Sequence, residues 1–274
     1  MISKSESWSS NQPSNSERIN NLDRVIAEGL IVRNTLFLNF GNATDLSEGQ
    51  ACILTALSPE VALADNPEAC PPTVLPLWMA FLVHRLSEGV SAAGWPAFSV
   101  GFAKTLRRIY TLTDDKHLWT DADWDHQSFL ACSIFLRLVA PRAGHSLTIV
   151  NDALWLCGRA ANGHKNGSMP LDAEWEATRR LAQFAKETAQ KEALAADPQL
   201  FLSLESFSKA RAANGPWAAA STAEAATSRM GSFGIALGVA DAASDAASGS
   251  GFNWHLIAND LLASFDARCA ELER

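Results

Sequence analysis

Apolar residues recur along most of this chain every three or four positions, the spacing that places side chains on one face of an α-helix. The first such stripe runs from Ile19 to Val25. It follows Ser16, a residue type that caps helices, and we expect the helix to continue through Phe40 with a bend at Gly29. The pattern therefore predicts that the folded part of the chain begins with a helix.

Helix starts further along the chain are marked by capping residues. Ser58-Pro59 places a capping side chain before a first-turn proline, and Thr120 with Asp123 resembles a capping box. No alternating run flanked by turn residues requires a β-strand. Together with the periodicity, the capping signals predict helices over residues 47–57, 74–88, 95–110, 120–140, 146–161, 172–194, 198–213, 217–247 and 253–274.

These segments predict an all-α protein, a single globular multi-helix bundle of about nine or ten helices over residues 16–274. The Ser- and Asn-rich segment 1–15 has little to bury, which predicts a disordered tail. Alanine becomes dominant near 210–216, a candidate sub-boundary within the domain. The helices over 74–88 and 120–139 are apolar nearly all round, so we expect both at the centre of the bundle.

The predicted helix over 172–194 is amphipathic, which is typical of a helix at the surface of a bundle. We expect its large apolar side chains, Trp175, Leu181, Phe184 and Leu194, to face the core and its charged side chains to face water. We therefore expect this helix to lie at the surface of the bundle.

Composition narrows the class of protein. The chain has 274 residues, of which 47% are hydrophobic and 19% charged, as in a globular protein. A net charge of −8 argues against nucleic-acid binding, and the apolar runs are shorter than the roughly 20 residues of a membrane-spanning helix. We therefore expect neither nucleic acid nor a membrane among its partners.

The cysteines bear on the compartment. Five of them are scattered without paired spacing, which argues against a disulfide framework or a structural zinc site and favours the cytoplasm. The tail at 1–15 has the composition found at the start of some bacterial proteins exported without a cleaved signal peptide, and this remains an alternative location.

An acidic segment contains the candidate metal ligands Asp121, Asp125 and His126. Carboxylates at alternate positions resemble the beginning of a calcium loop, but His126 stands where that loop needs glycine and Cys132 where it needs glutamate. Another divalent metal stays open, because carboxylates and imidazole are suitable ligands. The alternative, which we favour, is that acidic residues in the first helical turn stabilise the helix N-terminus.

Four further residues are candidates for catalysis. His84 and Glu88 are one helical turn apart and share a face, which suits an acid–base pair or a satisfied structural pair. Asp152 interrupts an apolar segment, and we expect it to be paired with Arg137 or Arg159 unless it lines a pocket. His145, just before that segment, is a candidate pocket residue or a neighbour of the helix start.

The chain has nine Trp and one Tyr. We expect Trp155 and Trp175 to be core residues. Four others stand at predicted helix starts, where they either anchor a partner or, as we favour, close the helix ends against the core; these are Trp95, Trp119, Trp217 and Trp254.

Two functions of different class follow from these features. We favour a helical protein that acts by binding another protein, as a scaffold, a regulator or a toxin-neutralising partner, and its acidity favours a basic partner. The alternative is an enzyme with a carboxylate and histidine site inside the bundle, which a divalent metal would serve. No organic cofactor is predicted, and the sequence leaves the substrate, the partner's identity and the oligomeric state open.

Overall fold

In the computed structural model of the chain, every regular element among the described residues is helical, which confirms the all-α prediction. The β-type pairing in this part of the chain is limited to a single bridge between Ile31 and Ala51. The structure describes residues 13–33, 50–64, 66–166, 168–197, 210–211, 213–228 and 254–274.

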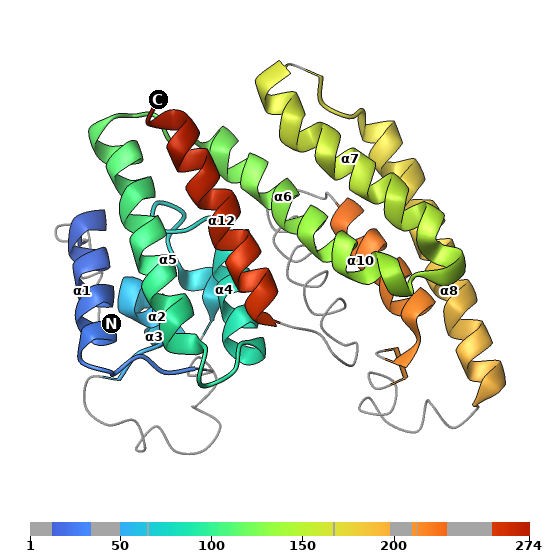
Figure 1. The fold of residues 1–274 in the computed structure, drawn as a ribbon, viewed down its shortest axis with the longest axis horizontal. Helices are drawn as coiled ribbons and strands as arrows, with labels where there is room; N and C mark the ends of the chain where they lie inside the picture. Colours follow the sequence, from blue (N-terminus) through green and yellow to red (C-terminus); the bar gives the residue numbers. More distant parts are fainter. Residues whose placement is uncertain are drawn as a thin grey trace, which may run out of the picture.

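The helices are numbered as in Figure 1. The α-helices are α1 (Asn15–Ala27), α2 (Ile53–Leu57), α3 (Pro59–Ala64), α4 (Leu77–Gly89), α5 (Trp95–Tyr110), α6 (Asp121–Val139), α7 (Leu147–Asn166), α8 (Asp172–Ala196), α10 (Gly215–Thr227) and α12 (Trp254–Leu272). Single turns of 3-10 helix cover Pro67–Ala69, Ala140–Arg142 and Gly144–Ser146, and a π-helical turn covers Thr111–Asp115.

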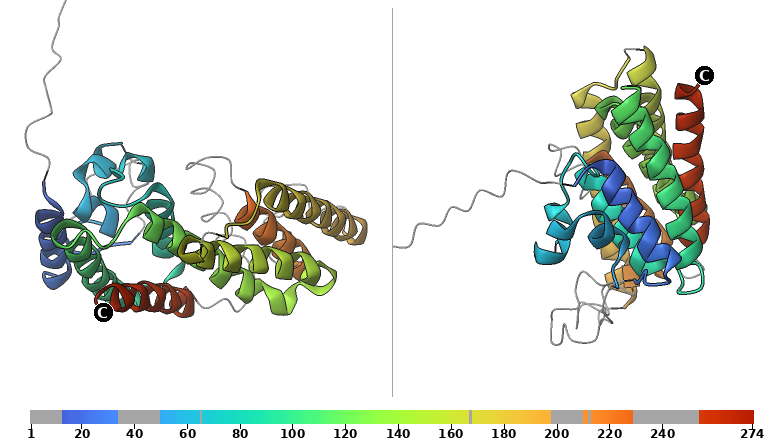
Figure 2. Two further views of the ribbon diagram at one scale, coloured as in Figure 1. Left: turned by 90° about the horizontal axis from the view of Figure 1, so that it is seen from above. Right: turned by 90° about the vertical axis from the view of Figure 1, so that its left-hand side faces the viewer.

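The helices form two groups that meet at α6. In one group α5 lies between α1 and α12, and Figure 2 shows α2 and α3 on the opposite side of α5 from α12. In the other group α7 packs against α6, and α10 packs against α6, α7 and α8. Because α6 also contacts α12, it joins the two groups, and Figure 1 shows it crossing the middle of the molecule.

Helix α1 ends earlier than its sequence pattern predicts. Ser14 and Glu17 form a capping box at its start, and Glu28 follows its last turn. Gly29 then has a φ of +70°, a left-handed conformation that turns the chain out of the helix. The prediction of one helix through Phe40 is therefore wrong beyond Ala27, and residues 34–49 lie outside the described part.

The central position predicted for the two most apolar helices is confirmed. Helix α4 buries Trp78, Leu82 and Leu86, and α6 buries residues on all sides, among them Phe129 and Phe135. These side chains belong to one buried cluster that extends from α1 to α12. Burial of this kind is the main favourable contribution to folding, at roughly 25 cal/mol per Å² of apolar surface.

Other expectations fall partly or wholly outside the described residues. The predicted tail includes 1–12, which are not described, while Ser14 and Asn15 already belong to the start of α1. Most of the predicted helix over 198–213 and most of the one over 217–247 are also outside, although the described residues 210, 211 and 213 are helical. The candidate sub-boundary near 210–216 contains Asn214, which caps α10, and the domain division stays a prediction. Among the described helices, none has the length and apolar character needed to cross a lipid bilayer.

One carboxylate fastens α12 to the beginning of α6. Asp123 Oδ2 accepts hydrogen bonds from the backbone N–H and the hydroxyl of Thr120, both at 2.8 Å, and so caps α6. Its other oxygen lies 2.7 Å from the Arg268 guanidinium of α12, and the Asp123 side chain is only 6% exposed. Next to this pair, Ser264 of α12 donates to the side-chain oxygen of Gln127 at 2.9 Å.

We predict that Asp123→Ala lowers the free energy of unfolding by about 2–4 kcal/mol, because it removes a helix cap and leaves the half-buried Arg268 with only the more exposed of its two carboxylate partners, Glu271. Asp121→Ala is the matched control: Asp121 is in the same turn but exposed, so its loss costs no more than about 1 kcal/mol. Urea denaturation followed by circular dichroism measures both variants. Equal losses would show that Asp123 acts only through the helix N-terminus.

Candidate functional site

The predicted metal ligands at the start of α6 are spread over its surface. Asp121 and Asp125 are exposed, and Nδ1 of His126 lies 2.6 Å from the carbonyl oxygen of Ala161 on α7. Among the described residues, no group of three His, Cys, Asp or Glu side chains is placed to hold a metal ion. The capping bonds of Asp123 support the alternative that this acidic segment stabilises the helix N-terminus.

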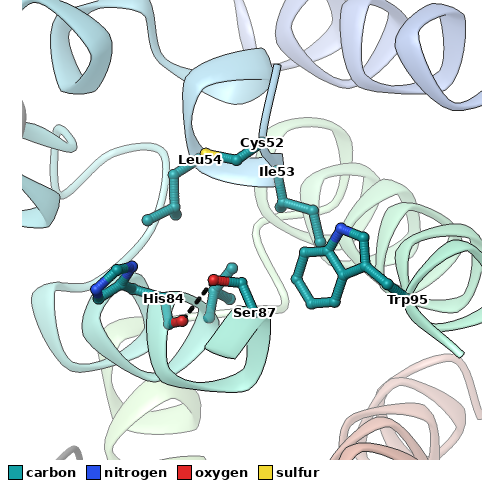
Figure 3. A pocket seen from close by; sticks show the side chains of 7 residues that line it. Cys52, Ile53, Leu54, His84, Ser87 and Trp95 are labelled. Atoms are coloured by element: carbon teal, nitrogen blue, oxygen red, sulfur yellow. Dashed lines mark hydrogen bonds between the residues drawn. The ribbon is translucent and has the colours of Figure 1, made fainter. Parts of the chain in front are cut away.

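His84 and Glu88 lie together, as their spacing predicts. His84 Nε2 is 3.7 Å from a carboxylate oxygen of Glu88, and the His84 side chain is 5% exposed. The histidine borders a pocket between α2 and α4 whose other walls include Cys52, Ser87 and Trp95 (Figure 3). The wall of the pocket therefore contains a buried imidazole, and Glu88, which is not among the lining residues, lies one helical turn further along α4.

The size of this pocket and the bonds around it limit its chemistry. Its free space is about 10 Å³, which suits one water molecule. The Ser87 hydroxyl donates to the carbonyl oxygen of His84 at 2.6 Å, as Figure 3 shows, and the Cys52 sulfur accepts a bond from the backbone N–H of Thr55 at 3.4 Å. Both potential nucleophiles are thus engaged with the backbone, and a substrate would need the walls to move apart.

The remaining two candidates lie elsewhere, on the outside of the second group of helices. Asp152 is exposed on α7 and has no ion-pair partner among the described residues, while Arg159 binds Glu174 at 2.7 Å. The prediction that Asp152 pairs with Arg137 or Arg159 is therefore wrong; the helix exposes this face, so its charges need no buried partner. His145 Nε2 lies 3.9 Å from a Glu192 carboxylate, and its side chain is 48% exposed.

The same face of α7 and α8 exposes apolar side chains that the sequence pattern assigns to the core. Trp155 of α7 is 56% exposed, and Leu181 and Phe184 of α8 are 52% and 69% exposed. These three expectations are wrong, whereas Trp175 is buried as predicted.

Small residues on the buried side of α8 explain why its large apolar side chains are exposed. The side of α8 that packs on α10 buries Ala182, Ala189 and Ala193, and Trp217 of α10 belongs to the same buried cluster as Ala189 and Ala193. The small alanines of α8 leave room for the large indole of Trp217, so the larger side chains of α8 are left on its other faces. The alanines at 182, 189 and 193 have helical spacing, and they are the signal in the sequence that would have shown the buried side.

Two cross-helix contacts show how α7 and α8 are aligned. Arg159 pairs with Glu174, and His145 lies next to Glu192, so the helices are antiparallel. Trp155 is therefore about level with Leu181. Figure 1 shows the two helices side by side at the edge of the molecule. We call this face the outer α7–α8 surface and define it by Trp155, Leu181, Phe184, Glu176, Arg180, Glu187 and Lys191.

Ionic contacts hold this surface in place. The Arg159 guanidinium carbon lies 4.6 Å from the centre of the Trp155 ring, a cation–π contact that orients the indole. Hydrogen bonds from Arg179 and then Arg180 lower the pKa of Glu176 to about 2, so this carboxylate is charged at neutral pH. The surface thus combines fixed charges with exposed apolar groups, a combination typical of protein-binding surfaces.

The tryptophans at helix starts do not supply such a surface. Trp95, Trp119 and Trp217 are between 2% and 3% exposed, which confirms the interpretation that they close helix ends against the core. Trp8 lies outside the described residues. Trp155, which the sequence pattern assigns to the core, is therefore far more accessible to a partner than Trp95, Trp119 or Trp217.

No protein-family model, curated protein or solved structure matches the chain. The outer α7–α8 surface and the His84 pocket are therefore weighed on their geometry and chemistry alone.

We predict that the thiols of the native protein react slowly with a thiol reagent near pH 8. All five cysteines are buried, and burial raises the pKa of Cys70 to about 12 and that of Cys269 to about 11, so both stay protonated. The same reagent should label all five thiols within minutes in concentrated urea. Mass spectrometry after timed labelling measures this. Rapid modification of Cys52 in the native state would instead favour an enzymatic pocket.

Proposed function

We propose that the protein works by binding another protein molecule through the outer α7–α8 surface. The observation that carries this proposal is the exposure of Trp155, Leu181 and Phe184 by more than half on two adjoining helices. Exposed large apolar groups that lie together and are edged by charges are typical of interaction sites, and Trp and Arg are enriched among the residues that dominate binding energy.

The energetics of this surface favour association. Burying a large apolar side chain such as Phe184 stabilises a complex by about 1.5–3 kcal/mol relative to leaving it exposed. The side chains project from two packed helices, and Trp155 is already oriented by Arg159. Little conformational entropy is therefore lost on binding, which leaves more of the contact energy as affinity.

Charge acts on two scales in this proposal. The net charge of −8 attracts a basic partner at long range and speeds its encounter. The surface itself carries both signs, with Arg180 and Lys191 beside Glu176 and Glu187. A scaffold, a regulator or a toxin-neutralising protein would each use such a surface.

An enzyme remains the second candidate because His84 lines a pocket and lies 3.7 Å from the carboxylate of Glu88. Catalysis there would require the pocket to open well beyond the space of one water molecule. Binding through α7 and α8 requires no rearrangement, so we place it first.

The test is a photo-reactive residue at position 181, illuminated in cells that produce the protein. We predict a covalent adduct with a protein partner from position 181 and none from position 100, because Val100 is 54% exposed on α5, away from this surface. For the purified partner, Phe184→Ser should weaken binding by at least about tenfold, whereas Leu256→Ser on α12 should not.

Both serine variants remove an exposed side chain, so their unfolding free energies should stay within about 0.5 kcal/mol of the parent's. Adducts that form equally from positions 181 and 100, or from neither, would exclude this surface as the binding site.

A further inference from the structure

The charges on the outside of α8 are arranged in a pattern that reverses in sign about the middle of the helix. Glu176 and Arg180 precede Phe184, and Glu187 and Lys191 follow it. About a midpoint between residues 183 and 184, Arg180 and Glu187 are equally distant, and so are Glu176 and Lys191. Each negative residue is therefore matched by a positive one at the same distance on the other side.

These residues also share one face of the helix. At 100° per residue the four charged residues lie within an arc of about 60°, and Phe184 lies about 20° beyond Lys191 at its edge. Phe184 is 69% exposed, and the Arg180 and Glu176 side chains are 73% and 41% exposed. The face points away from the alanines that pack on α10, so a partner can reach it.

A second α8 laid antiparallel on this face finds a complementary charge at each position. Arg180 would face Glu187 of the second copy, and Glu176 would face its Lys191. The twofold symmetry repeats both pairs, while Phe184 meets its own copy at the centre. Lys191 has no ion-pair partner among the described residues, and Glu187 accepts only a hydrogen bond from Gln183 at 3.2 Å.

The size of the surface is adequate for a stable dimer. A helix of 25 residues such as α8 is roughly 38 Å long, and two neighbouring helices are about 20 Å wide. The resulting face of roughly 750 Å² is close to the about 800 Å² per partner that specific interfaces bury. Leu181 lies about 60° further round α8 than Phe184, toward α7 and the exposed Trp155, and these two side chains add apolar contact at the border of the face.

We propose that the partner of the outer α7–α8 surface is a second copy of this chain, bound with the two α8 helices antiparallel and centred on Phe184. The inference rests on the proposed function, since it names the molecule that this surface binds. A second copy carries the same net charge of −8, so it is not the basic partner that long-range attraction favours, but salt at about 0.15 M screens charges more than about 8 Å apart. The opposite charges that meet in the contact, Arg180 with Glu187 and Glu176 with Lys191, then determine whether the two copies bind.

Sedimentation velocity of the full chain, from about 1 to 100 µM in about 0.15 M salt, tests this proposal. The parent protein should form a species of twice its 29.5 kDa mass as concentration rises. Arg180→Glu and Glu187→Arg should each weaken the dimer at least tenfold, because each substitution places two like-charge pairs at the symmetric contact. The double variant restores opposite charges, so it should regain dimerisation to within about threefold of the parent.

Phe184→Ser should leave the chain monomeric, whereas Val100→Ser should dimerise like the parent; circular dichroism confirms that each variant is folded. A monomeric parent, a dimer unaffected by Phe184→Ser, or a double variant no better than the single ones would overturn the proposal. If the parent is monomeric but position 181 still crosslinks to a different protein, only the proposal that the partner is a second copy is overturned. A monomeric parent with no adduct at that position overturns the binding surface as well.

Discussion

The close contact between α8 and α10 determines which side chains of α8 are exposed to solvent. Alanines on both helices let the backbones approach, and Lys186 of α8 binds Glu224 of α10 beside them. Trp217 of α10 already fills the space beside Ala189 and Ala193, which leaves no room there for a second large side chain from α8. Phe184 is consequently on the outside, so the chemistry of the surface follows from how the interior is packed.

The rest of the molecule is organised around α6, which contacts both groups of helices. Its apolar residues bury against α7, α10 and α12, while its first turn carries the polar contacts. Trp119 and Trp124, near that turn, pack on Phe265 of α12 with ring centroids 6.1 Å and 5.8 Å apart. Apolar packing and the Asp123–Arg268 pair therefore act at the same junction.

The fold class could be predicted from sequence because helical periodicity and capping residues are local. Thr120 with Asp123 is an example, since the capping box forms within one turn. The direction in which α8 faces could not be predicted in this way. An amphipathic stripe identifies the more apolar side, but Leu181 and Phe184 are excluded from the interior by residues of α10, which follow much later in the chain. Binding surfaces break the rule that large apolar groups are buried.

The two oxygens of Asp123 bind to different helices. One accepts the capping hydrogen bonds at the start of α6, and the other binds Arg268 of α12. If this carboxylate moves, α6 loses its capping hydrogen bonds and α12 loses the ion pair of Arg268. We therefore expect local opening at this end of the bundle to involve both helices, so that the amide protons of both segments exchange with solvent as one unit. A single side chain in this way joins parts of the chain 145 positions apart into one element of stability.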